Sequence, residues 1–323
     1  MSVRLHVVTG KGGTGKTTVA AALGLALASG GRRVLLAEVE GRQGIAQLFD
    51  CPPLPYEERK VAVAPGGGSL YALAVDAEEA LLDYLEMFYN LRRAGKALKR
   101  MGAIDFATTI APGMRDVLLT GKVVEAVKRK EKQLRPTYDA VVMDAPPTGR
   151  IVRFLNVHTE VAGLARVGPI RNQANAVNAI LRSPQTAVHL VTLLEEMPVQ
   201  ETIDGVAQLH DAELPVGAVV INMTRPPVLP PDALTRAAQG NVDKEELAQG
   251  LKAVGIDAPA SVIDGLAAEA TDHARRVELE ERERVQLAEL GRATYELPLL
   301  PEAIDLGSLY RLAGMLTEQG MVR

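Results

Sequence analysis

The chain has 323 residues, of which 47% are hydrophobic, 24% charged and 3% aromatic, and it contains no Trp. This composition is typical of a globular protein with a core of Ala, Val and Leu, and the length allows one large or two smaller domains. The formal net charge of -4 provides no overall field that would attract nucleic acid or an anionic membrane. We therefore expect no nucleic-acid partner.

Cysteine usage and apolar runs limit the class of protein further. Cys51 is the single cysteine, which excludes an intrachain disulfide and a CxxC zinc site within one chain. Lys11 follows the apolar residues 3–8 too soon for a signal peptide. Residues 19–31, the longest weakly polar stretch, are too few to span a membrane. The histidines show no metal-ligand spacing such as HExxH. We expect a cytoplasmic protein with no integral membrane span.

Short β-branched runs alternate with helical patterns along the chain. The runs lie at residues 5–8, 34–39, 70–75, 140–143, 187–193, 216–221 and 294–297. They are apolar on both faces, as are buried strands of a parallel sheet whose crossovers are helices. The pattern predicts a doubly wound, mostly parallel α/β fold, with residues 1–323 as one domain.

Two longer helical stretches interrupt this alternation. Residues 77–127 predict an inserted helical subdomain rich in Leu, Met and Phe, and residues 226–290 predict a second helical insertion. The second begins in a Pro-rich segment and ends in a charged helix at 275–290, whose charges are typical of a solvated face. The glycines at 66–68 predict a turn.

A phosphate-binding motif follows the first predicted strand and begins the helix predicted at 18–29. It consists of Gly10, Lys11, Gly12, Gly13, Thr14, Gly15, Lys16, Thr17 and Thr18. Glycines allow the backbone N–H groups to surround a β-phosphate, and the helix N-terminus adds partial positive charge. We expect Lys16 to reach the β- and γ-phosphates and Thr17 to coordinate Mg²⁺.

Lys11 stands second in this loop, where an ordinary phosphate loop needs no cation. A lysine there can extend across a subunit interface and stabilise transition-state charge in the partner's site. The alternative is a solvated loop lysine.

Carboxylates follow two of the predicted strands, at the sheet edge where ligands bind. Glu40 is a candidate to orient or deprotonate the attacking water, with Glu38 as its rival and a plain surface acid as the alternative. Asp144 ends a later strand and fits the second carboxylate that holds Mg²⁺. The Pro-Pro-Thr-Gly turn after it fits a switch that senses the γ-phosphate.

Asn222 and the loop after the last strand also fall at strand ends, where a base would lie. A turn Asn and an ordinary Pro-rich loop are the alternatives.

The string GKGGTGKTT at 10–18, together with DAPPTGRIVRFL at 144–155, resembles the ArsA family. That family includes the arsenite-pump ATPase and the ATPase that guides tail-anchored membrane proteins, and it belongs with MinD, ParA and the nitrogenase iron protein in the deviant-Walker-A group. Residues 35–50 and 106–122 resemble the actinobacterial ArsA-like ATPases in particular, and residues 187–222 and 296–301 resemble the family's later strands and adenine loop.

The resemblance implies a dimeric ATPase that binds ATP, ADP and Mg²⁺, paired with a second copy or with a related chain. It implies that Lys11 acts in trans, that Asp144 is the Walker B acid, and that Glu40 stands where the targeting ATPases have an aspartate base. Asn222 resembles the adenine-reading asparagine, and the adenine loop corresponds to Pro298, Leu299 and Pro301.

The resemblance also implies that residues 77–127 move with the nucleotide state and contact a hydrophobic protein client. The candidate client residues are Leu81, Leu85, Met87, Phe88, Leu91, Met101 and Met114; packing against the sheet is the alternative for them. The zinc-binding CxxC of the targeting ATPases and the metalloid cysteines of the arsenite pump are absent. Two further functions stay open: a ParA- or MinD-like positioning ATPase, and a low-turnover nucleotide-binding scaffold subunit of a heteromer.

Overall fold

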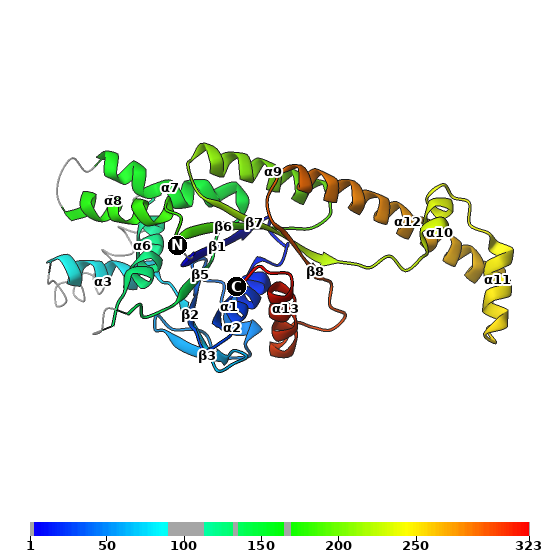
Figure 1. The fold of residues 1–323 in the computed structure, drawn as a ribbon, viewed down its shortest axis with the longest axis horizontal. Helices are drawn as coiled ribbons and strands as arrows, with labels where there is room; N and C mark the ends of the chain where they lie inside the picture. The colour runs from blue at the N-terminus through cyan, green and yellow to red at the C-terminus, as the bar shows by residue number, and fades with distance from the viewer. Residues whose placement is uncertain (1–2, 90–112, 132–134, 165–168, 323) are drawn as a thin grey trace.

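The computed structural model describes residues 3–89, 113–131, 135–164 and 169–322. An eight-stranded sheet with the order β3-β4-β2-β5-β1-β6-β7-β8 runs through its centre (Figure 1). The strands are β1 (Leu5–Gly10), β2 (Arg33–Glu38), β3 (Arg59–Val63), β4 (Ser69–Ala74), β5 (Ala140–Asp144), β6 (Thr186–Thr192), β7 (Val216–Thr224) and β8 (Thr294–Pro298). All neighbouring strands are parallel except β3 and β4. The predicted doubly wound α/β fold is confirmed, and each predicted strand is present.

β3 is the strand that the sequence analysis missed. It pairs antiparallel with β4 at the edge of the sheet, and most of its residues are at least partly exposed. A search for runs that are apolar on both faces finds central strands and overlooks an edge strand of this kind. The glycine-rich turn predicted at 66–68 joins the two strands, with Gly66 and Gly67 at φ 79° and 88°.

Helices cover both faces of the sheet (Figure 1). One layer contains α1 (Lys16–Ala28), α2 (Gly44–Leu48) and α13 (Leu306–Glu318); the other contains α6 (Met114–Lys128), α7 (Thr148–Leu164), α8 (Pro169–Leu181) and α9 (Glu196–Asp211). α3 (Ala77–Tyr89) packs against α6. α1 packs against both the sheet and α13, and nearly all of its residues are buried, as is typical of a helix that is apolar almost all round. No helix among the described residues is both long and apolar enough to cross a membrane.

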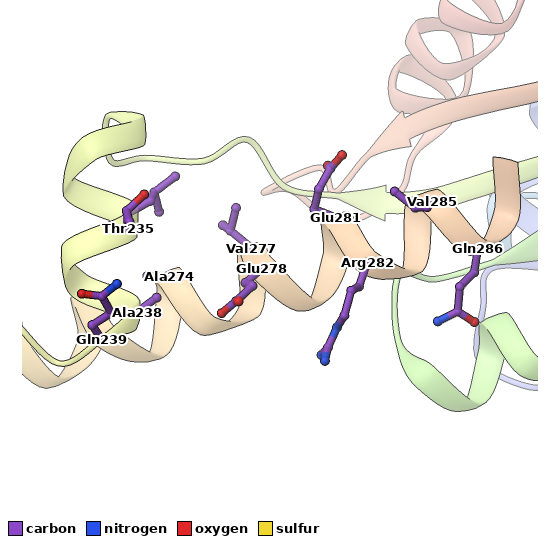
Figure 2. Close-up of a pocket in the computed structure, with 11 residues that line it drawn as sticks. Thr235, Ala238, Gln239, Ala274, Val277, Glu278, Glu281, Arg282, Val285 and Gln286 are labelled. Atoms are coloured by element: carbon purple, nitrogen blue, oxygen red, sulfur yellow. The ribbon is translucent and has the colours of Figure 1, made fainter.

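Three helices form a projection that we call the arm: α10 (Pro231–Ala238), α11 (Lys244–Ala253) and α12 (Ala260–Glu289). Figure 1 shows α12 leaving the sheet and carrying α10 and α11 toward its far end. The helix predicted at 275–290 begins earlier, at Ala260. Only its last turns reach the body, where Leu287 packs with Val199 of α9. A groove between α10 and α12 is lined by Leu234, Ala238, Val277, Glu278, Arg282 and Val285 (Figure 2).

Candidate nucleotide site

The phosphate loop connects β1 to α1 at the carboxyl edge of the sheet. Gly13 and Gly15 adopt φ of 90° and 84°, a backbone conformation that favours glycine. A side chain at Gly10 would overlap the Val191 carbonyl oxygen of the adjacent strand β6, whereas positions 12 and 13 face open space. α1 begins at Lys16, so the unpaired N–H groups of its first turn lie at the end of this loop. The loop therefore has the backbone geometry of an anion cradle.

Thr17 and Asp144 come together beside this loop, as predicted for two ligands of Mg²⁺. The Thr17 hydroxyl donates to the Asp144 carboxylate over 2.7 Å. Burial raises the pKa of Asp144 to about 6, opposed by the Thr17 hydrogen bond and Lys16 and supported by Glu38 and Glu40. A buried carboxylate beside two other acids gains free energy from a bound cation. Mg²⁺ usually takes few protein ligands and keeps several waters. The pair therefore fits a magnesium site.

Lys16 lies within the same cluster and is buried, with 9% of its surface exposed. Burial lowers the pKa of its ammonium group, whereas the nearby Asp144 and Glu40 raise it. An anionic phosphate in the cradle would compensate the desolvation of this ammonium. The electrostatics at Lys16 therefore favour an anionic ligand.

The two rival glutamates occupy different environments. Glu38 is buried, and its carboxylate accepts the backbone N–H groups of Gln43 and Ile45, so it fixes the start of α2. Glu40 is freer: its carboxylate lies 3.5 Å from Arg42 and 3.6 Å from Arg150. Each Glu40 oxygen faces one arginine at this longer distance and can still accept a hydrogen bond from a water, because a carboxylate oxygen has two lone pairs. Its role as general base stays a prediction.

The turn after β5 is tied to both the phosphate loop and the helical segment. The Thr9 hydroxyl of β1 donates to the Pro146 carbonyl over 2.6 Å. Arg150, in the first turn of α7, lies between Glu40 and Asp116 of α6, the latter at 3.9 Å. Arg150 therefore links the start of α7 to both Glu40 and α6. Asp116 was not among the predicted site residues, although it lies within residues 106–122, which resemble the actinobacterial ArsA-like ATPases.

Lys11 forms an ion pair within its own chain. Its ammonium lies 2.8 Å from Oε1 of Glu201 on α9. The Thr148 hydroxyl donates to Oε2 of the same carboxylate over 3.3 Å. Glu201 therefore contacts both the phosphate loop and the first residue of α7. Sequence reasoning missed it because it lies mid-helix and far along the chain.

Asn222 lies in a bulge of β7 rather than at its end. The register with β8 shifts between Ile221 and Thr224, and Met223 adopts φ 57°. Bulges of this kind re-aim side chains, and here the Asn222 amide donates to the Thr14 carbonyl over 2.9 Å. The amide thus braces the phosphate loop, and adenine recognition by it stays a prediction.

The predicted adenine loop begins at Pro298, the last residue of β8. Leu299 donates its backbone N–H to the Thr224 carbonyl and is 40% exposed. This bond holds the loop beside the end of β7. The start of the predicted adenine loop therefore lies beside the end of β7 that contains the Asn222 bulge. Contact of Pro298, Leu299 and Pro301 with a base stays a prediction.

A family model described as anion-transporting ATPase matches residues 3–172. This span includes the phosphate loop, Glu40, Asp144 and the turn that carries Arg150. The chain belongs to the anion-transporting ATPase family.

Relatives within this family cover different shares of the chain. ATPase BagA of Mycobacterium tuberculosis strain H37Rv is 54% identical over 319 residues, which are 99% of this chain and 94% of that protein. ATPase GET3 of Kluyveromyces lactis is 29% identical over 187 residues, 54% of this chain and 52% of its own. The arsenical pump-driving ATPase of Acidiphilium multivorum is 27% identical over 242 residues, 68% of this chain and 39% of its own.

The resemblance to the ArsA family is therefore confirmed. As a member of the anion-transporting ATPase family, the chain binds ATP and hydrolyses it. The geometry at Gly10, Lys16, Thr17 and Asp144 locates the candidate site for that reaction at the edge of the sheet.

Proposed function

We propose that this ATPase is a Mg²⁺-dependent dimeric switch of the cytoplasm that passes its nucleotide state to the helical segment 77–127. The supporting observation is the position of Arg150 between Glu40 of the nucleotide site and Asp116 of α6. Arg150 is 61% exposed and both ion pairs are long. Such pairs are weak and exchange easily, as a reversible connection requires.

The chemistry is proposed to rest on four side chains. Thr17 and Asp144 would hold Mg²⁺, which when bound neutralises charge on the β- and γ-phosphate oxygens. Lys16 would bind the same phosphates. Glu40 would orient or deprotonate the attacking water, with its carboxylate held between Arg42 and Arg150.

Dimerisation would complete the site. Lys11 is a third exposed and lies at the outer turn of the phosphate loop, so its ammonium can be presented to a second chain, either another copy or a related one. There it would act on transition-state charge, as an arginine finger does.

The helical segment is the proposed contact with an apolar protein client. Leu81 on α3 is half-buried and Met114 at the start of α6 is 37% exposed, and methionine adapts to varied apolar partners. Leu91 and Met101 lie outside the described residues, as do the side chains of Leu85, Met87 and Phe88 on α3.

Hydrogen exchange tests the coupling. We expect exchange in α6 to differ between the ADP state and a slowly hydrolysed ATP-analogue state, while β1 and β5 stay protected in both. Arg150→Gln should reduce that difference. Equal exchange in α6 across both states, with nucleotide occupancy confirmed, would contradict the coupling.

Mixing two inactive chains tests the trans arrangement. Lys11→Ala should bind ATP nearly normally but turn over slowly, and Asp144→Asn should also be slow. A mixture should exceed both parents, because one composite site combines a normal Asp144 with a normal Lys11. No gain on mixing would contradict action across an interface.

A further inference from the structure

The carboxylate of Glu201 has two separate contacts, and each reaches a part of the nucleotide site. Oε1 pairs with the Lys11 ammonium over 2.8 Å, and Oε2 accepts from the Thr148 hydroxyl over 3.3 Å. Thr148 is the first residue of α7 and belongs to the Pro-Pro-Thr-Gly turn that follows Asp144. The Glu201 side chain therefore contacts both the phosphate loop, at Lys11, and the Pro-Pro-Thr-Gly turn, which we call the switch turn, at Thr148.

The packing of α9 holds this carboxylate in place. A side chain at Gly205, one turn after Glu201, would lie 3.4 Å from Thr148 and 3.1 Å from Leu190, so α9 runs close to the start of α7 at this point. On α9, Val199 is fully buried against the end of the arm helix α12. The position of Glu201 is thus fixed by core contacts and not by the ion pair itself.

A phosphate in another chain would compete with Glu201 for the Lys11 ammonium. Lys11 and Glu201 are 32% and 36% exposed, and ion pairs this accessible to water contribute only a few-fold to an equilibrium. A phosphate whose charge exceeds that of one carboxylate competes well for such a lysine. The ion pair is therefore strong enough to favour the position of Lys11 beside Glu201, and weak enough for a phosphate to displace Glu201 from the lysine.

We propose that Glu201 is a positioning residue that holds Lys11 within its own chain until the ATP-bound dimer draws the lysine away. The Thr148 contact would make the position of Glu201 depend on the switch turn as well, because a movement of α7 would remove the Thr148 donor from the same carboxylate. The inference rests on the proposed trans role of Lys11.

The resting contact is tested without nucleotide by acetylating lysines and measuring Lys11 by mass spectrometry. Glu201→Gln should increase the labelling of Lys11 about two- to fivefold, because the amine loses its ion pair. Glu196→Gln, which removes an exposed charge from the same helix, should leave it unchanged. Equal labelling in wild type and Glu201→Gln would overturn the proposal.

Turnover tests the consequence for catalysis. Glu201→Gln should raise kcat about two- to fivefold with little change in KM, since it removes a competitor for Lys11 and no contact to ATP. Glu201→Asp should return kcat toward the wild-type value. In a Lys11→Ala background, Glu201→Gln should have no effect.

The outcomes separate this proposal from the proposed function. A fall in kcat for Glu201→Gln would mean that the carboxylate orients Lys11 for catalysis, and an increase that persists without Lys11 would mean that Glu201 acts elsewhere; each overturns the proposal. If Lys11→Ala turns over normally, the trans role fails. If Lys11→Ala is slow while labelling is unaffected by Glu201→Gln, the trans role stands and the holding role fails.

Discussion

The candidate nucleotide site and the arm are built in opposite ways. At the site, Gly10 and Gly15 have no space for a side chain, and Asp144 and Asn222 are buried. On the arm, every residue of α11 is at least partly exposed and Gly250 has open space around it. The conformation of the site is determined by close packing of its atoms. The conformation of α11 on the arm depends mainly on helix propensity and on contact with solvent. The same substitution should therefore have very different effects in the two regions.

Two buried histidines, His6 on β1 and His189 on β6, are expected to make folding sensitive to acid. His189 accepts the Ala218 N–H at Nδ1, so its Nε2 carries the proton shared with His6 Nδ1 over 3.1 Å. Burial lowers the pKa of both rings, and for His189 the proximity of His6 adds to it. Both rings are therefore neutral in the folded protein.

We expect the largest effect from acid. In the unfolded chain a histidine titrates near pH 6.5, so below that pH the unfolded state binds more protons and folding stability falls. The loss should approach ~3 kcal/mol for each ring by pH 4. Asp144 acts with the opposite sign, because its pKa is raised to about 6 and acid relieves its buried charge.

Urea unfolding between pH 7.5 and 5 measures this slope. His6→Gln should flatten it relative to wild type, whatever its effect on stability at pH 7.5, whereas exposed His210→Gln should not. An unchanged slope in His6→Gln would mean that His6 binds its proton equally well in the folded and unfolded states.

The next largest effect is expected on ATP affinity, when removal of a buried lysine is compared with removal of an exposed one. Lys16→Ala should weaken ATP binding by about 100-fold, or ~3 kcal/mol, because a charge-assisted contact to phosphate is removed. Lys244 on the arm pairs with Asp264 over 2.7 Å, but both are well exposed, so Lys244→Ala should leave ATP affinity unchanged. Calorimetry measures both. Wild-type affinity in Lys16→Ala would remove Lys16 from the site.

Replacing a glycine by alanine should change the stability of the two regions by smaller amounts and in opposite directions. Gly15→Ala should destabilise the fold by about 1–3 kcal/mol, because it forces a side chain into a left-handed conformation and against the Asn222 amide. Gly250→Ala should stabilise α11 by about 0.5–1 kcal/mol, since alanine favours a helix interior. Thermal unfolding measures both. Equal shifts in Tm would contradict the comparison between the two regions.

Sequence reasoning succeeded where the information is contiguous. The phosphate loop is one unbroken string between a strand and a helix, and the central strands are apolar on both faces, so the fold and the positions of Lys16, Thr17 and Asp144 followed from local patterns. β3 was missed because an edge strand with exposed residues lacks the pattern that marks a central one.

Contacts between distant elements could not be predicted in this way. Glu201 reaches Lys11 because α9 crosses close to α7 at Gly205, and Arg150 reaches Asp116 because α6 packs beside α7. The bulge that aims Asn222 at the phosphate loop depends on the register with β8. Each is a consequence of packing, for which one sequence carries no local signal.

The last prediction is that removal of zinc has no effect on the proposed dimer. Structural zinc requires four ligands, usually thiolates and imidazoles. Cys51 is the single cysteine, so a symmetric dimer would offer at most two thiolates. Within the described ranges no group of three or more His, Cys, Asp or Glu side chains is arranged to hold a metal ion. Chelating zinc and restoring magnesium should therefore leave the mass in solution unchanged, as light scattering measures, with Cys51→Ser as the control. If chelation instead lowers the mass, and Cys51→Ser reproduces the loss, the interface contains a zinc site formed by both chains.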